Sequence, residues 1–201
     1  GKQRHLFLMA QKSGAVALQA RVRDVVCRCA AGGRAGFSGF LSEEEAREVQ
    51  RLVQKEKAEN TLLWGGYPGA ERVMFGAFPD FLQPAEDKFP LSAVTALFRK
   101  CERLSHRDFL GALLHTGIER SALGDILVEE GRCVFFCRRE IAGFLLSQVA
   151  KIGGVGVKMT EGFLSPLPRA HCFREWSAVI ASARLDCAAA AAVSTSRGKA
   201  A

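Results

Sequence analysis

The sequence predicts an α+β fold, and three observations carry this prediction. An amphipathic helix with capping residues begins after Ser42, and a second capped helix begins after Ser105. The segment GDILVEEGRCVFFC, which follows the second helix, has the strand–turn–strand pattern of a β-hairpin. Strand, helix, hairpin, helix and strand in this order are typical of helices packed on one sheet.

The first part of the chain is predicted to be mainly helical. Residues 3–30 favour one or two helices in which basic residues alternate with apolar ones, and a Gly-Gly pair at 32–33 ends them. Ser42 and Glu45 have the spacing of a capping box, and the helix that they open extends to about Lys57. One face of this helix is apolar, and we interpret it as facing the core: Ala46, Val49, Leu52 and Val53.

Turn and apolar signals alternate from residue 61 to residue 79, and ERVMFGAFP is predicted to be a short strand. Residues 90–103 are apolar and fit either a helix or a strand. A helix is predicted over 105–119, where Gly111 would allow close packing and Gly117 would help the chain to leave the helix. The remaining expected elements are a hairpin of 123–129 and 131–137 with its turn at Glu130-Gly131, a helix from Arg139 to about Ile152, and a strand at VGVKMT.

Composition indicates a folded protein, and the charge balance suits an anionic partner. The 201 residues are 48% hydrophobic with only six prolines, enough to bury the core of one large or two small domains. The formal charge is +7, and its positive excess lies mainly in residues 1–40 (+6) and 166–201 (+3). Such a balance suits RNA or an anionic membrane surface. No apolar run reaches the roughly 18 residues that a membrane span needs.

Seven cysteines are scattered along the chain without the paired spacing of a zinc site. We expect reduced thiols in a reducing compartment. Two short cysteine spacings were weighed as metal ligands, namely Cys27-x-Cys29 and Cys133-x3-Cys137 with His171, but such spacings arise easily by chance. The sequence therefore predicts neither a metal site nor a cofactor.

The triplet His106-Arg107-Asp108 matches the catalytic loop of protein kinases but lacks the rest of that machinery. A kinase needs an Asn five residues after the Asp, and position 113 is Leu. The phosphate loop, the strand Lys and the magnesium-binding Asp-Phe-Gly are also missing. Asp108 instead stands where a helix begins, so we interpret its carboxylate as a helix cap. No nucleophile with an oriented base is recognisable either, and no enzymatic activity is expected.

Three segments, taken together, resemble the YlmH-type family of S4-domain RNA-binding proteins. They are GGYPGAER at 65–72, LSHRDFLGALLHTGIERSALGDIL at 104–127 and ARLDCAAAAAVSTSRGKAA at 183–201. The resemblance covers almost the whole chain from about Phe37, and related plant and cyanobacterial members are called photosystem II S4 domain proteins. It implies an N-terminal α/β domain at 1–88, a ferredoxin-like RNA-binding-type domain at 89–165, and a linker with the start of an S4 domain at 166–201.

The resemblance also implies a function. Members of the family are non-enzymatic and bind the large ribosomal subunit with its transfer RNA during translation quality control. We therefore expect binding to ribosomal RNA, transfer RNA or both, and no DNA or membrane partner. The alternative is a protein-interaction scaffold in which the S4 segment is vestigial. An RNA-modifying enzyme would need a catalytic Asp in a modification domain, and no such motif is found.

Candidate RNA-binding residues come from two segments. In the S4 segment, two helix starts with hydroxyl and cationic side chains offer donors to phosphates: Arg184, Asp186, Ser194, Thr195, Ser196, Arg197 and Lys199. In the central segment the candidates are Arg103, His106, Arg107, Arg120, Arg138 and Arg139. Alternation along the hairpin places one of Phe135 and Phe136 outside, as a base-stacking platform or as core.

The ends of the chain give two further expectations. The sequence begins at Gly1 and stops at Ala201 before an S4 fold would be complete, so we expect a fragment or a processed form. The many cysteines and the alanine run suggest plastid stroma for a eukaryotic source, and otherwise the cytoplasm of a bacterium.

Overall fold

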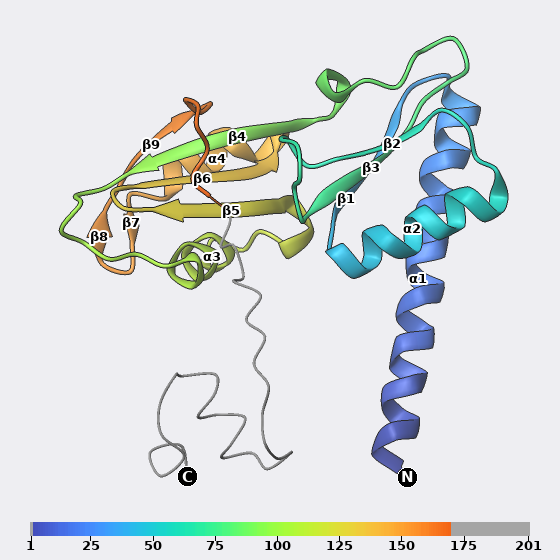
Figure 1. Ribbon diagram of the computed structural model, residues 1–201, viewed down its shortest axis with the longest axis horizontal. Helices are drawn as coiled ribbons and strands as arrows, with labels where there is room; N and C mark the ends of the chain where they lie inside the picture. Colours follow the sequence, from blue (N-terminus) through green and yellow to red (C-terminus); the bar gives the residue numbers. More distant parts are fainter. Residues whose placement is uncertain (1, 170–201) are drawn as a thin grey trace, which may run out of the picture. The chain divides into compact units, whose positions relative to one another are not determined.

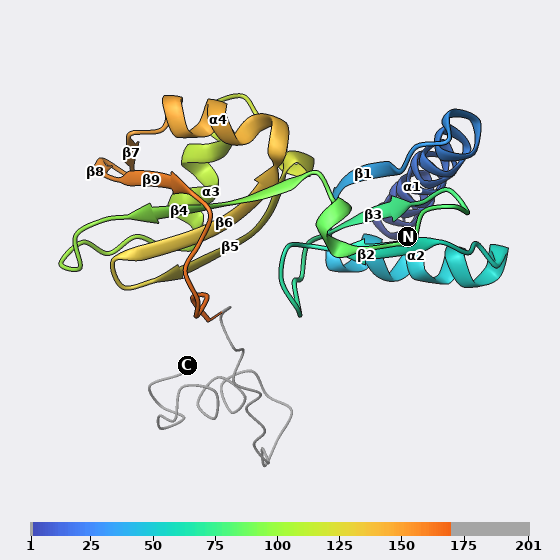
Figure 2. The same ribbon diagram turned by 90° about the horizontal axis from the view of Figure 1, so that it is seen from above.

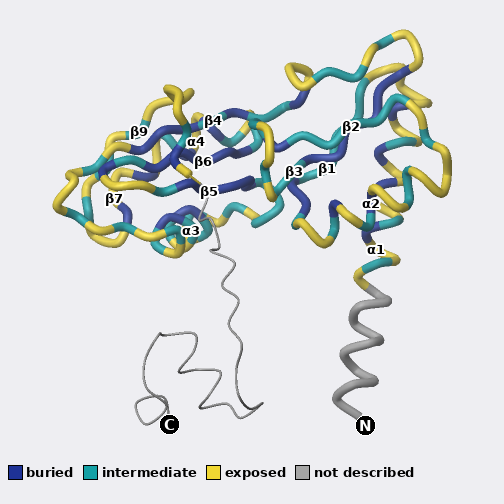
Figure 3. The backbone as a smooth tube through the Cα atoms, in the orientation of Figure 1, coloured by how far each residue is buried: buried dark blue, intermediate teal, exposed yellow. Residues whose placement is uncertain are grey.

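The computed structural model describes residues 2–169, and for residues 2–13 it describes the helical backbone only. The described residues belong to one compact unit with three antiparallel sheets. The predictions for the S4 segment lie outside the described residues. Figure 3 shows that buried residues follow the strands of the two larger sheets.

The N-terminal part is a three-stranded sheet with two helices (Figure 1). Its strands run in the order β1 (Gly36–Leu41), β3 (Val73–Ala77) and β2 (Thr61–Trp64). Helices α1 (Lys2–Gly32) and α2 (Glu43–Glu56) pack on one face of this sheet. The buried residues of α1 recur every three or four positions, as one helical stripe requires, at Leu18, Val22, Val25 and Cys29.

Helix α2 begins and ends as its sequence predicts. The Glu45 amide donates to Ser42 Oγ at 3.2 Å, and the Ser42 amide donates to Glu45 Oε2 at 2.9 Å, which completes the capping box. Lys57 stops the helix in a left-handed conformation at φ 49°. The expected apolar face is confirmed for three of its four residues, because Ala46 and Val49 are buried in the core and Val53 packs against it. Leu52 is partly exposed and is not among the residues of this core.

The central part is a four-stranded antiparallel sheet in the order β5–β6–β4–β9, built along the chain as strand, helix, hairpin, helix and strand. This order confirms the expected ferredoxin-like layout. Its elements are β4 (Leu91–Leu97), α3 (His106–His115), β5 (Leu123–Glu129), β6 (Arg132–Arg138), α4 (Arg139–Gln148) and β9 (Lys158–Glu161). Two short 3₁₀ turns, Glu86–Lys88 and Arg120–Ala122, precede β4 and β5.

Both central helices cover the same face of the sheet, as Figure 2 shows. Their buried residues Phe109, Leu113 and Leu145 pack against Val94 and Phe135 from the strands. On the opposite face, Leu127, Val134 and Phe136 form one cluster with residues of the N-terminal sheet, among them Phe40 and Met74. The helix-free face of the central sheet is therefore part of a core.

Helix α3 is capped by Ser105 together with Asp108, the last residue of the triplet that resembles a kinase loop. The Ser105 amide and hydroxyl both donate to Asp108 Oδ2 at 2.7 Å, and the Asp108 amide donates back to Ser105 Oγ at 3.3 Å. These donors, the hydroxyl first, hold the pKa of Asp108 below its ordinary value of 3.8. The interpretation of Asp108 as a helix cap is confirmed.

Several boundaries differ from the predictions. Helix α3 ends at His115 and not at 119, because the chain turns at Gly117, whose φ is 89°. Helix α4 ends at Gln148, and the next residues form a small hairpin of β7 (Lys151–Ile152) and β8 (Val155–Gly156). The expectation for Gly111 is wrong, since a methyl group placed there would meet no packed neighbour within 4 Å.

Strands β1 and β2 were not predicted. Strand β1 has the sequence GFSGFL, in which two glycines and a serine lower the intrinsic strand propensity. Strand β2 has only four residues and borders the glycine-rich turn at 65–66. Both become strands because they pair with the apolar strand β3, which lies between them.

A buried carboxylate joins the glycine-rich segment 65–72 to strand β5. Asp125 is 7% exposed and accepts hydrogen bonds from Tyr67 Oη at 2.6 Å, from the Glu71 amide at 2.8 Å and from the Arg72 amide at 2.9 Å. The guanidinium of Arg72 donates to the carbonyl of Leu123 at 3.1 Å. One acidic side chain thus satisfies three donors of a loop more than 50 positions away in sequence.

The glycines of this segment allow its close approach to the central sheet. A Cβ on Gly66 would lie 2.3 Å from the Phe136 ring, and the φ of Gly66 is 106°. A side chain at this position would force the loop away from the sheet. The pattern GGYPGAER is therefore explained by packing against Phe136 and by bonding to Asp125.

Replacing Asp125 by Ala should destabilise the fold by about 3–5 kcal/mol, because three donors lose their buried acceptor and the nearby guanidinium groups lose a neighbouring negative charge. The free energy of unfolding in urea would measure the loss. Asp87→Ala removes a carboxylate whose side chain is 75% exposed and should change stability by less than about 0.5 kcal/mol. Equal effects of the two substitutions would contradict a structural role for Asp125.

The stabilisation from Asp108 should depend on pH. Because the folded-state pKa is depressed, the contribution is fully present above pH 3.8 and is lost as the pH falls through the lower folded value. The difference in Tm between the native chain and Asp108→Asn should therefore shrink in acid. Ser105→Ala should reduce the same pH dependence, since it removes the hydroxyl donor. A difference in Tm that stays constant down to acid pH would contradict this role of the Asp108 carboxylate in the cap.

Candidate nucleic-acid interface

The helix-free face of the central sheet does not present an aromatic platform for bases. Phe135 points into the core under the helices and is 0% exposed, while Phe136 lies on the other face and is 1% exposed. Tyr67 stacks on Phe136 with ring centroids 5.1 Å apart at 27°, and Phe163 meets it edge-on at 6.0 Å. Phe135 and Phe136 are thus both core residues.

The segment after β9 helps to close this face. Thr95 Oγ1 donates to the carbonyl of Gly162 at 2.6 Å, and the guanidinium of Arg132 donates to the carbonyl of Leu164 at 2.9 Å. Leu167 packs against the cluster that contains Phe136. A base could stack on this sheet only if both this segment and the loop with Tyr67 moved away.

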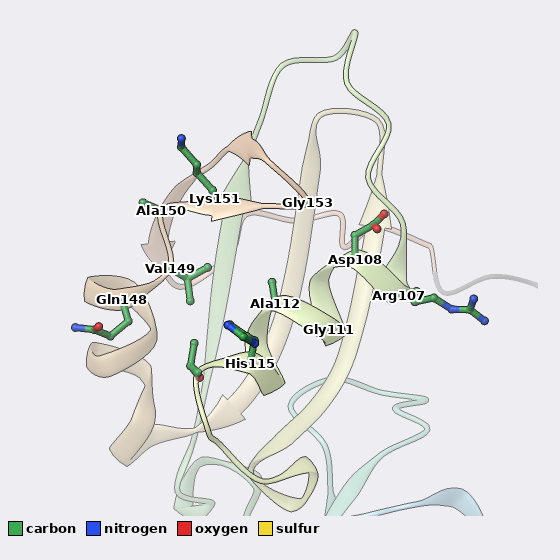
Figure 4. Close-up of a pocket in the computed structure, with 11 residues that line it drawn as sticks. Arg107, Asp108, Gly111, Ala112, His115, Gln148, Val149, Ala150, Lys151 and Gly153 are labelled. Atoms are coloured by element: carbon green, nitrogen blue, oxygen red, sulfur yellow. The ribbon is translucent and has the colours of Figure 1, made fainter.

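An open groove of about 700 Å³ lies on the helical side of the domain, between α3 and the chain from the end of α4 to β7 (Figure 4). Gly111, Ala112 and Val149 are among the residues that line it. Arg107 extends outward from α3, and Lys151 extends outward from β7 (Figure 4). The groove therefore combines small uncharged residues with cations whose head groups are accessible.

A second hollow of about 430 Å³ adjoins the groove and adds two cations, Arg99 and Lys158. Ala150 lines both hollows, so they are neighbours on the domain. Arg99 is paired with Glu102 at 3.4 Å, whereas Arg107, Lys151 and Lys158 form no ion pair within the described part of the chain. We call this surface, defined by Arg99, Arg107, Lys151 and Lys158, the basic rim.

The carboxylate of Asp108 also faces the groove, yet its hydrogen bonds are directed at Ser105. It offsets part of the local positive charge, and its Oδ2 is occupied by the two Ser105 donors. The basic rim can attract phosphate groups, and the described groups in the groove include no nucleophile paired with an oriented base.

The predicted central candidates have different environments. Arg103 and Arg107 are exposed, and His106 is partly exposed at the start of α3. Arg120 is half-buried, and its guanidinium donates to the carbonyls of Leu123 at 2.8 Å and Gly124 at 3.3 Å. Burial first, and then the neighbouring Arg72, lower the pKa of Arg120 to about 10. Among the described residues Arg120 forms no ion pair with the adjacent Glu119, which accepts a hydrogen bond from Ser121.

Sequence reasoning missed Arg99, Lys151 and Lys158. Lys151 and Lys158 flank the Gly-Gly turn at 153–154, which was interpreted as the end of a helix. A Gly-Gly pair between two lysines and short apolar segments is also the signal of a tight hairpin, and it could have located this edge. The S4 candidates lie outside the described residues: Arg184, Asp186, Ser194, Thr195, Ser196, Arg197 and Lys199.

The described cysteines have the properties of packed or exposed thiols. Residues 2–169 contain no group of three or more His, Cys, Asp or Glu side chains that could hold a metal ion. Cys133 and Cys137 are buried in the core, and burial raises the pKa of Cys137 to about 12. No described helix is long and apolar enough to cross a membrane.

Comparison with known proteins agrees with this layout. The family model described as "Putative RNA-binding domain in YlmH" matches residues 84–165. The chain is 33% identical over 104 residues to "Ribosome-associated protein quality control protein P2" of Bacillus subtilis (strain 168), a match that covers 51% of this chain and 40% of that protein. The chain thus spans well under half the length of this curated relative.

A solved structure has the same fold. "Cell division protein ylmH from Streptococcus pneumoniae" superposes with a TM-score of 0.58 and 21% identity, over 81% of this chain and 92% of that one. At this identity the likeness concerns the fold. The match of residues 84–165, the Bacillus relative and this shared fold are all similarities to YlmH-type proteins.

Proposed function

We propose that this protein is a non-enzymatic RNA-binding protein that acts in association with the ribosome. The observation that carries the proposal is the match of residues 84–165 to the RNA-binding domain of YlmH, which includes the groove and the basic rim. The name of the Bacillus relative, a ribosome-associated quality control protein, supports the ribosomal setting.

Binding would depend on phosphate contacts and not on base stacking. The sheet face on which RNA-recognition domains stack bases is filled by Phe136, Tyr67 and Phe163. The basic rim instead presents accessible cations along one side of the domain. Lys and Arg contacts of this kind fix a protein on the nucleic-acid backbone and respond strongly to salt.

The finer assignment is also part of the proposal. The RNA would be ribosomal RNA, transfer RNA or both, on the large ribosomal subunit during translation quality control. The S4 segment, with Arg184 and Arg197, would supply a second contact. Such a protein would work in plastid stroma or in bacterial cytoplasm, wherever its ribosomes are.

The double substitution Arg107→Ala/Lys151→Ala tests the basic rim. It should weaken binding to ribosomal RNA by roughly tenfold at low salt and reduce the slope of log affinity against log salt by about two, one for each lost phosphate contact. Fluorescence anisotropy across a salt series would measure both quantities.

The matched control is Arg47→Ala/Arg51→Ala, which removes two exposed cations of α2 that already pair with Glu43 and Glu48. This control should bind RNA nearly as the native chain does. Equal loss in both double variants would mean that net charge and not the rim governs binding. RNase-resistant capture of a protein partner, with no measurable RNA affinity, would favour the scaffold alternative.

A further inference from the structure

Gly111 occupies a position in α3 that the fold itself does not explain. It lies in the sixth position of a ten-residue helix and is exposed. A methyl group placed there would meet no packed neighbour within 4 Å, and the φ of Gly111 is not positive. Neither close packing nor backbone conformation within the described chain requires glycine here.

Glycine inside a helix lowers stability relative to alanine, because its backbone is freer in the unfolded chain. An exposed helical position with open space would be more stable as alanine. Gly143 in α4 is exposed with the same open space, so what distinguishes Gly111 is its place in the groove, where a residue without a side chain lets a ligand approach the helix backbone closely.

The surroundings of Gly111 indicate what approaches it. On α3, Arg107 precedes it by one turn and His115 follows by one turn, so the three residues share a face. Lys151 and Gly153 belong to the other wall of the groove (Figure 4). The missing side chain therefore widens the groove between two unpaired cations.

We propose that the sugar–phosphate backbone of an RNA strand lies in this groove and contacts α3 directly at Gly111, while Arg107 and Lys151 bind its phosphates. This inference rests on the proposed function. It adds where on the domain the RNA backbone makes contact and how closely it approaches α3. Charge complementarity favours RNA, since an apolar protein segment would leave both cations beside it unmatched. One oxygen of the facing Asp108 carboxylate, Oδ2, accepts from Ser105, and among the described residues the carboxylate forms no ion pair with either cation.

The test is Gly111→Ala, compared with Gly143→Ala in the full chain. Gly143 is an exposed glycine inside α4 with the same open space around it, but it does not line the groove. Both variants should unfold at a higher Tm than the native chain, because both gain helix propensity. Only Gly111→Ala should bind a fluorescently labelled ribosomal RNA hairpin more weakly, by about three- to tenfold, and Gly111→Leu should lose more.

A gain in Tm together with a loss of RNA affinity cannot come from damage to the fold. Unchanged affinity in Gly111→Ala and Gly111→Leu, with weaker binding in Arg107→Ala/Lys151→Ala, would overturn the contact at Gly111 but leave the proposed function standing. Suppose that heparin, a non-specific polyanion, displaces the hairpin readily from the native chain and that none of these variants changes binding. The RNA-binding role of the groove then fails as well. Equal loss in Gly143→Ala would also overturn the inference.

Discussion

The carboxylate of Asp125 is the interaction on which the arrangement of the protein depends. It accepts three hydrogen bonds from the segment 65–72, and through them the N-terminal sheet is fastened to β5 of the central sheet. Because a buried carboxylate without partners is costly, the loop and the strand stabilise each other only as a pair. The same contact brings Tyr67 over Phe136 and so closes the helix-free face. Of the two sides of the central sheet, the helical one carries the open groove.

This arrangement divides the arginines into two kinds. Arg72 and Arg120 are half-buried beside Asp125, and their guanidinium groups donate to backbone carbonyls of β5 and its neighbours. Desolvation lowers the pKa of both, although both remain charged at neutral pH because an arginine titrates far above it. Arg107, by contrast, is exposed on α3 with no ion partner among the described residues. Arginines that look alike in the sequence therefore differ in whether a phosphate can reach them.

The groove depends on chain segments that are distant in sequence and on small residues as much as on charge. Helix α3 supplies one wall, and the residues from the end of α4 to the β7–β8 hairpin supply the other. The capping box of Ser105 and Asp108 fixes where α3 begins, and hence where Arg107 and Gly111 face the groove. The triplet that matches a kinase catalytic loop thus helps to fix where a helix begins. The residues next to it contribute to the surface of the groove.

The sequence by itself determined the local elements with strong signals: the capped starts of α2 and α3, the β5–β6 hairpin, and through the family resemblance the ferredoxin-like order of strands. These follow from short-range hydrogen bonds and from the period of apolar residues, which the sequence displays directly. Only the tertiary structure decided that GFSGFL and TLLW are strands, that Phe135 and Phe136 are both buried, and that Arg120 bonds to the backbone. The two weak strands depend on pairing with β3, and the burial of Phe136 depends on Tyr67. Arg120 bonds to carbonyls only three and four positions away, but its half-buried setting includes Arg72 from the distant glycine-rich segment. Long-range contacts of this kind produce no periodic pattern in the sequence, so only the folded structure reveals them.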